Sequence, residues 1–333
     1  MAINWKLIFK AVCYEIYYYV IGAAAIVEDF MNGHRNKLEL VQRPGDVAVI
    51  TGGARGIGVE VVKNLLKCDM HVIIGCRNTK AGERTIERIR SLGVTSGSAE
   101  CFTLDMASFK SIKEFAANVT VKHPALHLLI NNAGIMFVPF SLTEDGYESH
   151  FAVNYLGHCL LTHLLLPQLK VGGHSRGLNA RIINVSSSAH VAGNINFKDF
   201  NLKEMYVASE AYAQSKLAQL LFTKKLESLL RESDSHVQVH AVHPGVVNTD
   251  LFNDTTLKKI FPWVPPLLFK TPAQGAITIM HACLSPLLEG CGGNYLSNSR
   301  VIANSPKADN KVTQDKLWDA MRKIVEVHMF GEM

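Results

Sequence analysis

Short apolar runs alternate with longer amphipathic stretches along most of this chain. The apolar runs that predict strands are residues 47–50, 71–75, 100–104, 126–130, 180–185 and 237–242. The stretches with helical spacing of apolar positions are residues 57–67, 81–92, 108–119, 149–170 and 211–231. Buried strands that alternate with helices predict an α/β fold with one doubly wound parallel sheet and helices on both of its faces.

The segment before these elements has a different pattern. From Leu7 to Val27 it is apolar and carries only Lys10 and Glu15 as charged residues. As a helix it would cross about 30 Å of hydrocarbon. Three interpretations stay open: a membrane anchor, a cleaved signal peptide with alanines 23–25 near the cut, or a helix packed on the folded domain.

A polar linker is expected over residues 28–43. The predicted organisation is therefore a hydrophobic N-terminal anchor and linker, residues 1–43, followed by one Rossmann-type domain, residues 44–333. An anchor favours a membrane-associated protein, whereas a signal peptide would favour a secreted one.

Composition narrows the classes of function. The 333 residues are 48% hydrophobic and 19% charged, which is typical of a globular protein with a substantial core. The net charge of +5 is spread along the chain without a dense basic run, so a nucleic-acid partner is not expected. The seven cysteines show no CxxC spacing, which predicts neither a disulfide framework nor a zinc site.

A glycine-rich loop follows the first predicted strand. It reads Thr51-Gly52-Gly53-Ala54-Arg55-Gly56-Ile57-Gly58 and leads into a predicted helix. Glycines let backbone N–H groups approach a pyrophosphate at a helix N-terminus and let the helix pack closely on the strand. At the first junction of a parallel sheet, this loop predicts a dinucleotide site.

The ends of the next two strands bear on which dinucleotide binds. An acid after the second strand would accept a hydrogen bond from a ribose 2′-hydroxyl, but the chain has Arg77 there. Together with Arg55, Arg77 favours a 2′-phosphate and hence NADP(H), unless it only solvates the turn. Asp105 is placed to accept a hydrogen bond from the adenine amino group or, alternatively, to cap the helix that begins near Ser108.

Tyr212 and Lys216 lie four residues apart, on one face of a predicted helix. A phenol with a pKa near 10 is a poor base at neutral pH, and a nearby ammonium favours its ionised form. Residues 131–134 follow the fourth predicted strand, and residues 184–188 end the fifth. Both lie at the edge of the sheet where open α/β sheets bind ligands. A serine hydroxyl there would hold a substrate oxygen.

In their order along the chain, TGGARGIG, NNAG, NVSS and YAQSK resemble the motifs of the short-chain dehydrogenases/reductases, over about residues 46–298. The resemblance implies an oxidoreductase with a catalytic tetrad of Asn154, Ser187, Tyr212 and Lys216. Tyr212 would exchange a proton with a substrate oxygen that Ser187 polarises. Lys216 would lower the Tyr212 pKa and bind ribose, and Asn154 would hold a water. The other serines, 186 and 188, remain alternatives to Ser187.

The resemblance and the residue arguments together define a predicted cofactor site. Its residues are Thr51, Gly52, Arg55, Gly56, Ile57, Gly58, Arg77, Asp105, Asn132, Ala133, Gly134, Tyr212, Lys216, Pro244, Gly245 and Thr249. Ser187 and Tyr212 would contact the substrate. Some such enzymes use both cofactors, which leaves NAD(H) open beside NADP(H). A non-catalytic NADP-binding sensor is the alternative, but all four tetrad positions are filled, which favours an enzyme.

Further stretches, with an insertion at residues 194–206, resemble a branch of the family near the retinol dehydrogenases. They imply a hydrophobic alcohol and its aldehyde or ketone, of polyprenol or dolichol type, with retinol or a steroid as the alternative. Residues 252–269, which include Phe261 and Trp263, suit a substrate lid or, alternatively, ordinary core. Membrane lipid at the endoplasmic reticulum or lipid droplets is the other expected partner. The resemblance is also compatible with a homodimer.

Overall fold

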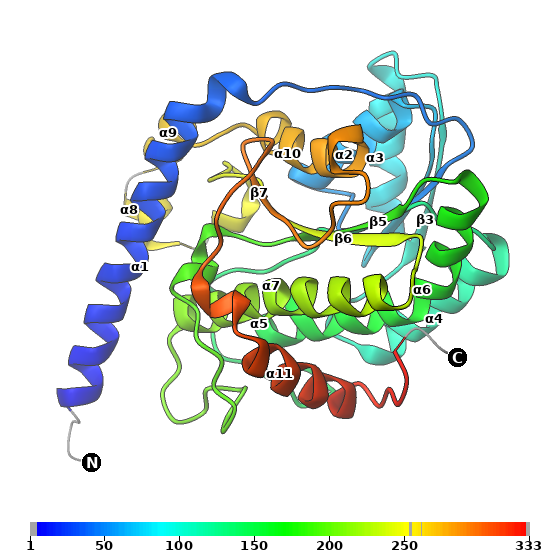
Figure 1. The fold of residues 1–333 in the computed structure, drawn as a ribbon. Coiled ribbons are helices and arrows are strands. Elements are labelled where there is room, and N and C mark those ends of the chain that lie inside the picture. Colours follow the sequence, from blue (N-terminus) through cyan, green and yellow to red (C-terminus); the bar gives the residue numbers. More distant parts are fainter. Residues whose placement is uncertain (1–4, 253–254, 261, 331–333) are drawn as a thin grey trace.

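The parallel sheet forms the centre of the molecule in the computed structural model, which describes residues 5–252, 255–260 and 262–330. Its strand order is β3-β2-β1-β4-β5-β6-β7-β8 (Figure 1). The strands are β1 Val47–Thr51, β2 His71–Cys76, β3 Ser98–Thr103, β4 Leu128–Asn131, β5 Ala180–Val185, β6 Val237–His243, β7 Tyr295–Ser297 and β8 Arg300–Val301. Every neighbouring pair from β3 to β7 is parallel, whereas β8 runs antiparallel to β7.

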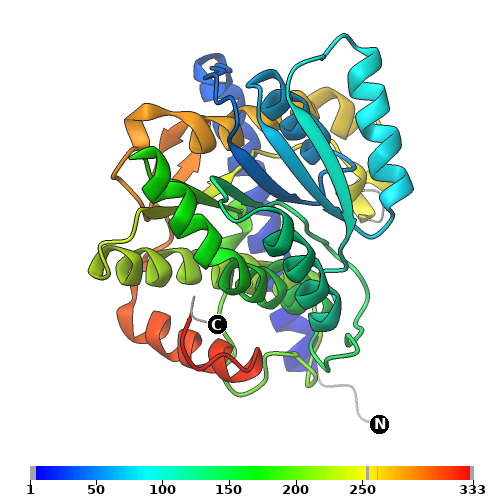
Figure 2. The ribbon, with the colours of Figure 1, turned by 90° about the vertical axis from the view of Figure 1, so that its right-hand side faces the viewer.

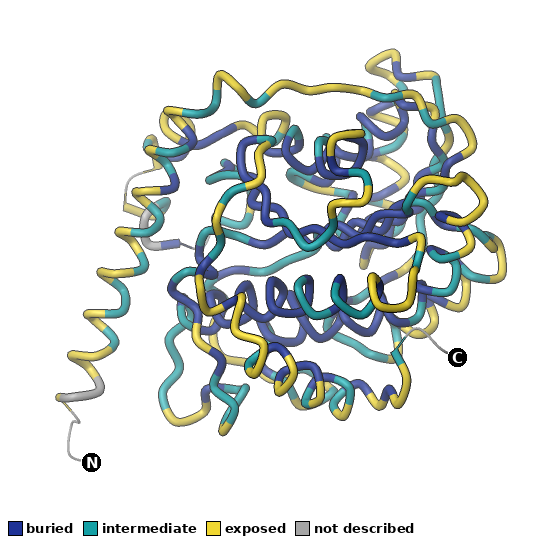
Figure 3. Tube along the Cα trace, in the orientation of Figure 1, coloured by how far each residue is buried: buried dark blue, intermediate teal, exposed yellow. Residues whose placement is uncertain are grey.

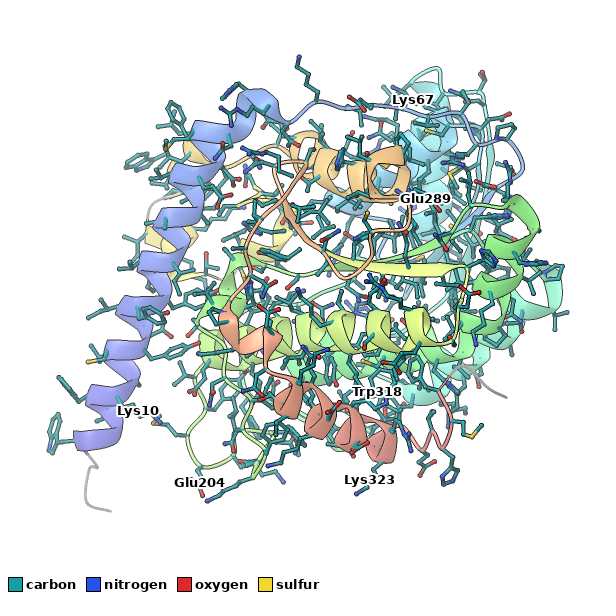
Figure 4. All side chains as sticks on the ribbon, viewed as in Figure 1. Lys10, Lys67, Glu204, Glu289, Trp318 and Lys323 are labelled. Atoms are coloured by element: carbon teal, nitrogen blue, oxygen red, sulfur yellow. The ribbon has the colours of Figure 1, made fainter. Side chains whose placement is uncertain are left out.

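Helices cover both faces of the sheet, which confirms the predicted fold class (Figures 1 and 2). On one face lie α2 Ile57–Lys67, α3 Thr79–Ser91 and α10 Pro272–Leu284. On the other lie α4 Phe109–Lys122, α6 Gly157–Arg176 and α7 Ala208–Glu232. A further layer, α11 Lys311–Ile324, which carries Trp318, packs on α7 (Figure 4). The Trp318 ring stacks on that of Phe222 with ring centroids 5.7 Å apart.

Six of the strands coincide with the predicted apolar runs, and the differences lie elsewhere. The short strands β7 and β8 and the helices α10 and α11 have no counterpart among the predicted elements. The expected helix over residues 149–170 begins instead with the short α5, Ser149–Phe151, followed by a π-helical turn, Ala152–Leu156, before α6. A single widened turn leaves the apolar pattern almost unchanged, so periodicity does not reveal it.

The N-terminal segment is one helix, α1 Trp5–Asn32, that runs along the body of the protein at the carboxyl ends of the parallel strands (Figures 1 and 3). The stretch Ile8–Arg35 is long and apolar enough to cross a membrane, with a mean hydropathy of 1.3. The three interpretations stay open: the helix contacts the body through Tyr14 and Asp29, but only 6% of its most apolar window is buried.

The expected polar linker over residues 28–43 is wrong in its first part. The helix continues through Asp29 to Asn32, and a 3₁₀ turn, Gly33–Arg35, follows. The next residue, Asn36, donates to the Gln274 carbonyl at 3.3 Å and accepts from the Ser299 hydroxyl. Asp29 is charged and interrupts the apolar pattern, but in the structure it makes a buried ion pair. A sequence pattern cannot distinguish a buried, paired charge from a solvated one.

Candidate active site

The glycine loop between β1 and α2 is closed by contacts that a side chain would block. A Cβ on Gly58 would lie 2.3 Å from the Gly52 carbonyl oxygen, and Gly52 and Gly56 have φ of +69° and +54°. No side chain caps the start of α2 at Gly56, so the first N–H groups of that helix remain available to an anion. The residues present therefore fit a dinucleotide pyrophosphate.

Thr51 connects this loop to the end of β4. Its Oγ1 accepts from the backbone N–H groups of Asn132 at 3.0 Å and Ala133 at 2.9 Å. The hydroxyl also lies 3.0 Å from Nε2 of His158, whose Nδ1 lies 3.1 Å from the Asn154 carbonyl. Burial lowers the pKa of His158 to about 3, so the ring is neutral and its two nitrogens link Thr51 to Asn154.

The predicted adenosine-side residues lie at the ends of β2 and β3. Arg77 follows β2 directly and is exposed, as is Arg55 in the glycine loop. Neither guanidinium has an ion-pair partner among the residues that the structure describes. Asp105 follows β3, and its Oδ1 accepts from the Ala107 N–H at 3.0 Å. Ser108, rather than Asp105, caps α4, so the alternative capping role for Asp105 is wrong.

Tyr212 and Ser187 meet where β5 ends beside the first turns of α7. Tyr212 is only 5% exposed, and burial raises its pKa to about 12, while a side-chain hydrogen bond with Ser187 opposes that rise. Ser186 instead donates to the Lys216 carbonyl, and the Ser188 N–H donates to His243. Of the three neighbouring serines, Ser187 is therefore the one that contacts the phenol.

Lys216 lies one turn beyond Tyr212 on α7, with its Nζ 5.7 Å from the centre of the phenol ring. The ammonium donates to the Val185 carbonyl at 2.8 Å and to the Gln219 side chain at 3.0 Å. Burial lowers the pKa of Lys216 to about 7. That Lys216 lowers the Tyr212 pKa stays a prediction; in the structure the Ser187 side chain lowers it.

Asn154 lies in the π-helical turn, and its side chain is fully engaged. Its Oδ1 accepts from the Ile135 N–H at 2.9 Å, and its Nδ2 donates to the Ile135 carbonyl and to Ser215 Oγ, at 3.0 and 2.9 Å. A Cβ on Gly134 would lie 3.3 Å from Asn154 Oδ1 and 3.8 Å from the Lys216 ammonium. The structure thus brings residues from β4, the π-turn and α7 together.

The loop after β6, residues 244–249, was predicted to lie on the cofactor side of the site. The Thr249 side chain faces Gly56 in the glycine loop, because a Cβ on Gly56 would meet it at 3.4 Å. Gly245 has φ +93° and lies against Asp29 of α1. Asp29 accepts from the Val246 N–H at 2.8 Å and pairs with the Lys270 ammonium at 2.7 Å.

The predicted lid contains two short helices, α8 Thr256–Ile260 and α9 Val264–Leu268 (Figure 1). The side chains of Trp263 and Leu267 are 62% and 71% exposed, whereas Phe269 is buried against Phe252. Exposure of the largest groups argues against ordinary core for this part. Phe261 lies outside the described residues.

Three residues of the site were not assigned a role from sequence: His158, Ser215 and Asp29. The spacing from Asn154 to His158 is that of helical neighbours, so this contact had a local signal. Ser215 accepts from Asn154 and donates to the Tyr212 carbonyl at 2.7 Å, again within a turn. Asp29 had no such signal, since its partner Val246 lies 217 residues away.

Comparison with known proteins agrees with this arrangement. A model of the short chain dehydrogenase family matches residues 46–259. The chain therefore belongs to the short-chain dehydrogenase family, as its motifs predicted, and the family is one of oxidoreductases.

Within that family, the chain is similar to two curated human proteins over most of its length. Polyprenol dehydrogenase of Homo sapiens is 42% identical over 308 residues, which cover 90% of this chain and 92% of that protein. Retinol dehydrogenase 11 of Homo sapiens is 41% identical over 281 residues, 84% of this chain and 85% of that protein. Among solved structures, an uncharacterised protein from Mycobacterium Paratuberculosis is 31% identical, covers 87% of this chain and 96% of its own, and has a TM-score of 0.70.

Proposed function

We propose that this protein interconverts a hydrophobic alcohol of the polyprenoid class and its aldehyde, with NADP(H) as the preferred cofactor. One observation carries the proposal: Tyr212 is buried inside a cluster of apolar side chains, and the Ser187 side chain lowers the pKa of its phenol. Acid–base groups of this kind serve proton exchange with an alcohol or carbonyl oxygen. The apolar surroundings and the 42% identity to a polyprenol dehydrogenase support the substrate class.

The chain's own residues handle the proton. A nicotinamide supplies or accepts hydride when bound. With a pKa of about 12, Tyr212 is protonated at neutral pH and is ready to donate its proton to a carbonyl oxygen. The Ser187 hydroxyl, beside the phenol, donates to the same oxygen and fixes its position. Lys216 holds the ribose side and, because burial lowers its pKa to about 7, titrates near neutral pH.

The position of Asn154 fits a supporting role in the proton transfer at Tyr212. Its amide is committed to Ile135 and Ser215, and its main-chain carbonyl lies 3.1 Å from Nδ1 of His158. Asn154 therefore connects the segment after β4 to α7 and positions the groups around Tyr212 and Lys216.

Preference for NADP(H) is proposed from two exposed guanidinium groups, Arg77 after β2 and Arg55 in the glycine loop. A charge-assisted hydrogen bond to a 2′-phosphate contributes about 1.5–3 kcal/mol. Titrating the Arg77→Ala variant with both reduced cofactors tests this. We expect NADPH to bind about 10–150-fold more weakly and NADH to bind unchanged. An equal loss for both would mean that Arg77 is structural.

Association with a membrane is proposed from the outer face of α1. Ile16, Val20 and Phe30 are 60%, 60% and 91% exposed. Trp263 and Leu267, in the segment predicted as a lid, are exposed as well. Large exposed apolar surfaces on one side of a protein are typical of membrane or partner contacts. A substrate dissolved in the endoplasmic reticulum or lipid-droplet membrane would then be close to the site.

The test of the proposed function is a screen of the purified full-length protein with polyprenoid, retinoid and steroid alcohols and carbonyls, against both cofactors. We expect the highest kcat/KM for a polyprenoid aldehyde with NADPH. Retinal is the second candidate, because the 41% identity to a retinol dehydrogenase is close to that of the first relative. Turnover of steroids alone would overturn the proposal.

A further inference from the structure

Three consecutive tyrosines show that α1 has two different faces. Tyr17 and Tyr19 are 49% and 47% exposed. Tyr18, between them, points toward the body, where its ring lies 5.5 Å from that of Phe137 in an edge-to-face arrangement. Phe137 in turn lies 6.1 Å, edge-to-face, from the ring of Tyr212. A continuous line of rings therefore leads from the N-terminal helix to the proposed acid–base group.

The inner face of α1 belongs to the apolar cluster around Tyr212. Tyr14, Tyr18 and Ile21 pack against that cluster, and Phe137 packs beside them. These side chains carry no charge, which suits a hydrocarbon better than a polar substrate.

Polar contacts hold the helix in this position. The Tyr14 hydroxyl donates to the Ala192 carbonyl at 3.4 Å, in the turn that follows Ser187. Glu15 accepts a hydrogen bond from Ser209, one turn before Tyr212 on α7. At the other end of α1, Asp29 is tied to Val246 and Lys270. The helix is thus fixed to both the substrate side and the nicotinamide side of the site.

We propose that the inner face of α1, through Tyr14, Tyr18 and Ile21, forms a wall of the binding site for the apolar chain of the substrate. This rests on the proposed function and names the element that recognises the chain beyond its reacting end. The same helix presents its outer face to lipid. A prenyl chain therefore passes from the bilayer to Tyr212 along Tyr18 and Phe137 without crossing water.

Chain-length selectivity tests this directly, because Tyr18 is separated from Tyr212 by the ring of Phe137. The rings of Tyr18 and Tyr212 lie 5.5 and 6.1 Å from that of Phe137, and so within about 12 Å of each other. The five-carbon aldehyde 3-methylbut-2-enal therefore reaches no further than Phe137, whereas geranylgeranial extends past it to Tyr18. For Tyr18→Ala in detergent micelles, we expect KM for geranylgeranial to rise about tenfold or more. KM for 3-methylbut-2-enal and the Kd for NADPH should stay unchanged, and Tyr18→Phe should restore the long-chain KM.

Tyr19→Ala is the matched control, one residue away on the exposed face. It should leave both KM values as in the wild type. If Tyr18→Ala and Tyr19→Ala have the same chain-length profile, the wall is not where we place it. Equal losses for all aldehydes together with a lower Tm would assign Tyr18 to folding alone and would also overturn the proposal.

Photolabelling separates this inference from the proposed function. A diazirine-bearing analogue of geranylgeranial should label the peptide that contains Tyr14, Tyr18 and Ile21, and unlabelled geranylgeraniol should compete. Labelling without turnover of any prenyl aldehyde would support the wall and reject the proposed reaction. Turnover without labelling of α1 would support the reaction and reject the wall.

Discussion

The cofactor end and the substrate end of the site are held together in different ways. At the cofactor end, backbone packs on backbone within a few residues, as where Gly58 approaches the Gly52 carbonyl. At the substrate end, side chains join segments far apart in sequence: Glu15 and Ser209 are 194 residues apart. A site can therefore have one half that is encoded by a short local motif and another half that depends on a helix preceding the domain.

Substitutions in the Asp29–Lys270 pair are expected to have the largest effect on the half of the site that distant segments hold together. Both groups are about nine-tenths buried, at 9% and 8% exposure, and Asn298 hydrogen-bonds to each of them. Removing one charge of a buried pair leaves the other uncompensated, which costs about 3–5 kcal/mol. We expect Asp29→Asn to lower the free energy of unfolding by that amount in a urea titration.

The double variant Asp29→Asn, Lys270→Met sharpens this prediction. Loss of both charges should cost less than loss of Asp29 alone, because no unpaired ammonium remains buried. Additive losses would show that the pair does not tie α1 to the loop that contains Val246.

A substitution in the glycine loop tests the other half of the site, which a short local motif encodes. In Gly58→Ala the new Cβ would lie within 2.3 Å of a backbone oxygen, so the loop must open. Overpacking of this kind costs about 1–3 kcal/mol, and we expect about 5–150-fold weaker NADPH binding by fluorescence titration. Gly22→Ala in α1, where a Cβ meets nothing within 4 Å, is the control. Unchanged NADPH affinity in Gly58→Ala would contradict the proposed cofactor site.

A pH-dependent effect on stability is expected from the titration of Lys216. Its pKa is about 7 in the folded protein against 10.5 ordinarily, so between these values the unfolded chain holds a proton that the folded chain has lost. The stability of the cofactor-free protein therefore rises with pH across this window, and the cost of burying the charge is complete below about pH 7.

The variant Lys216→Met isolates this contribution. Its advantage in free energy of unfolding over the wild type should be largest near pH 7 and should shrink toward about pH 10. Urea unfolding of both proteins at several pH values gives the difference directly. Curves that stay parallel would show that Lys216 is not responsible for the pH dependence.

Much of the fold could be predicted because its signals are local. The central strands are short apolar runs, and the glycine loop and the pair Tyr212–Lys216 are each contained within one turn or loop. Ser187 could be assigned only through the order of motifs. The structure adds a reason for choosing it, since the Ser187 side chain lowers the Tyr212 pKa, whereas the Ser186 hydroxyl donates to the Lys216 carbonyl.

The substrate end could not be predicted in the same way. Asp29 was predicted to be a linker residue, because nothing near it in the sequence shows that Lys270 lies beside it. Tyr17, Tyr18 and Tyr19 are chemically identical in the sequence, and only the docking of α1 makes Tyr18 face the site. Packing between distant segments depends on the folded domain that receives the helix, and a helical pattern does not contain that information.

The most direct measurement of the account is the rate of NADPH oxidation by Tyr212→Phe with a polyprenoid aldehyde. The substitution removes only a hydroxyl, so Tm and the Kd for NADPH should match the wild type. The proton-transfer contribution is about 10²–10⁴-fold, and kcat should fall by that factor. Near-normal turnover by Tyr212→Phe would contradict the assignment of Tyr212 as the group that exchanges the proton with the substrate.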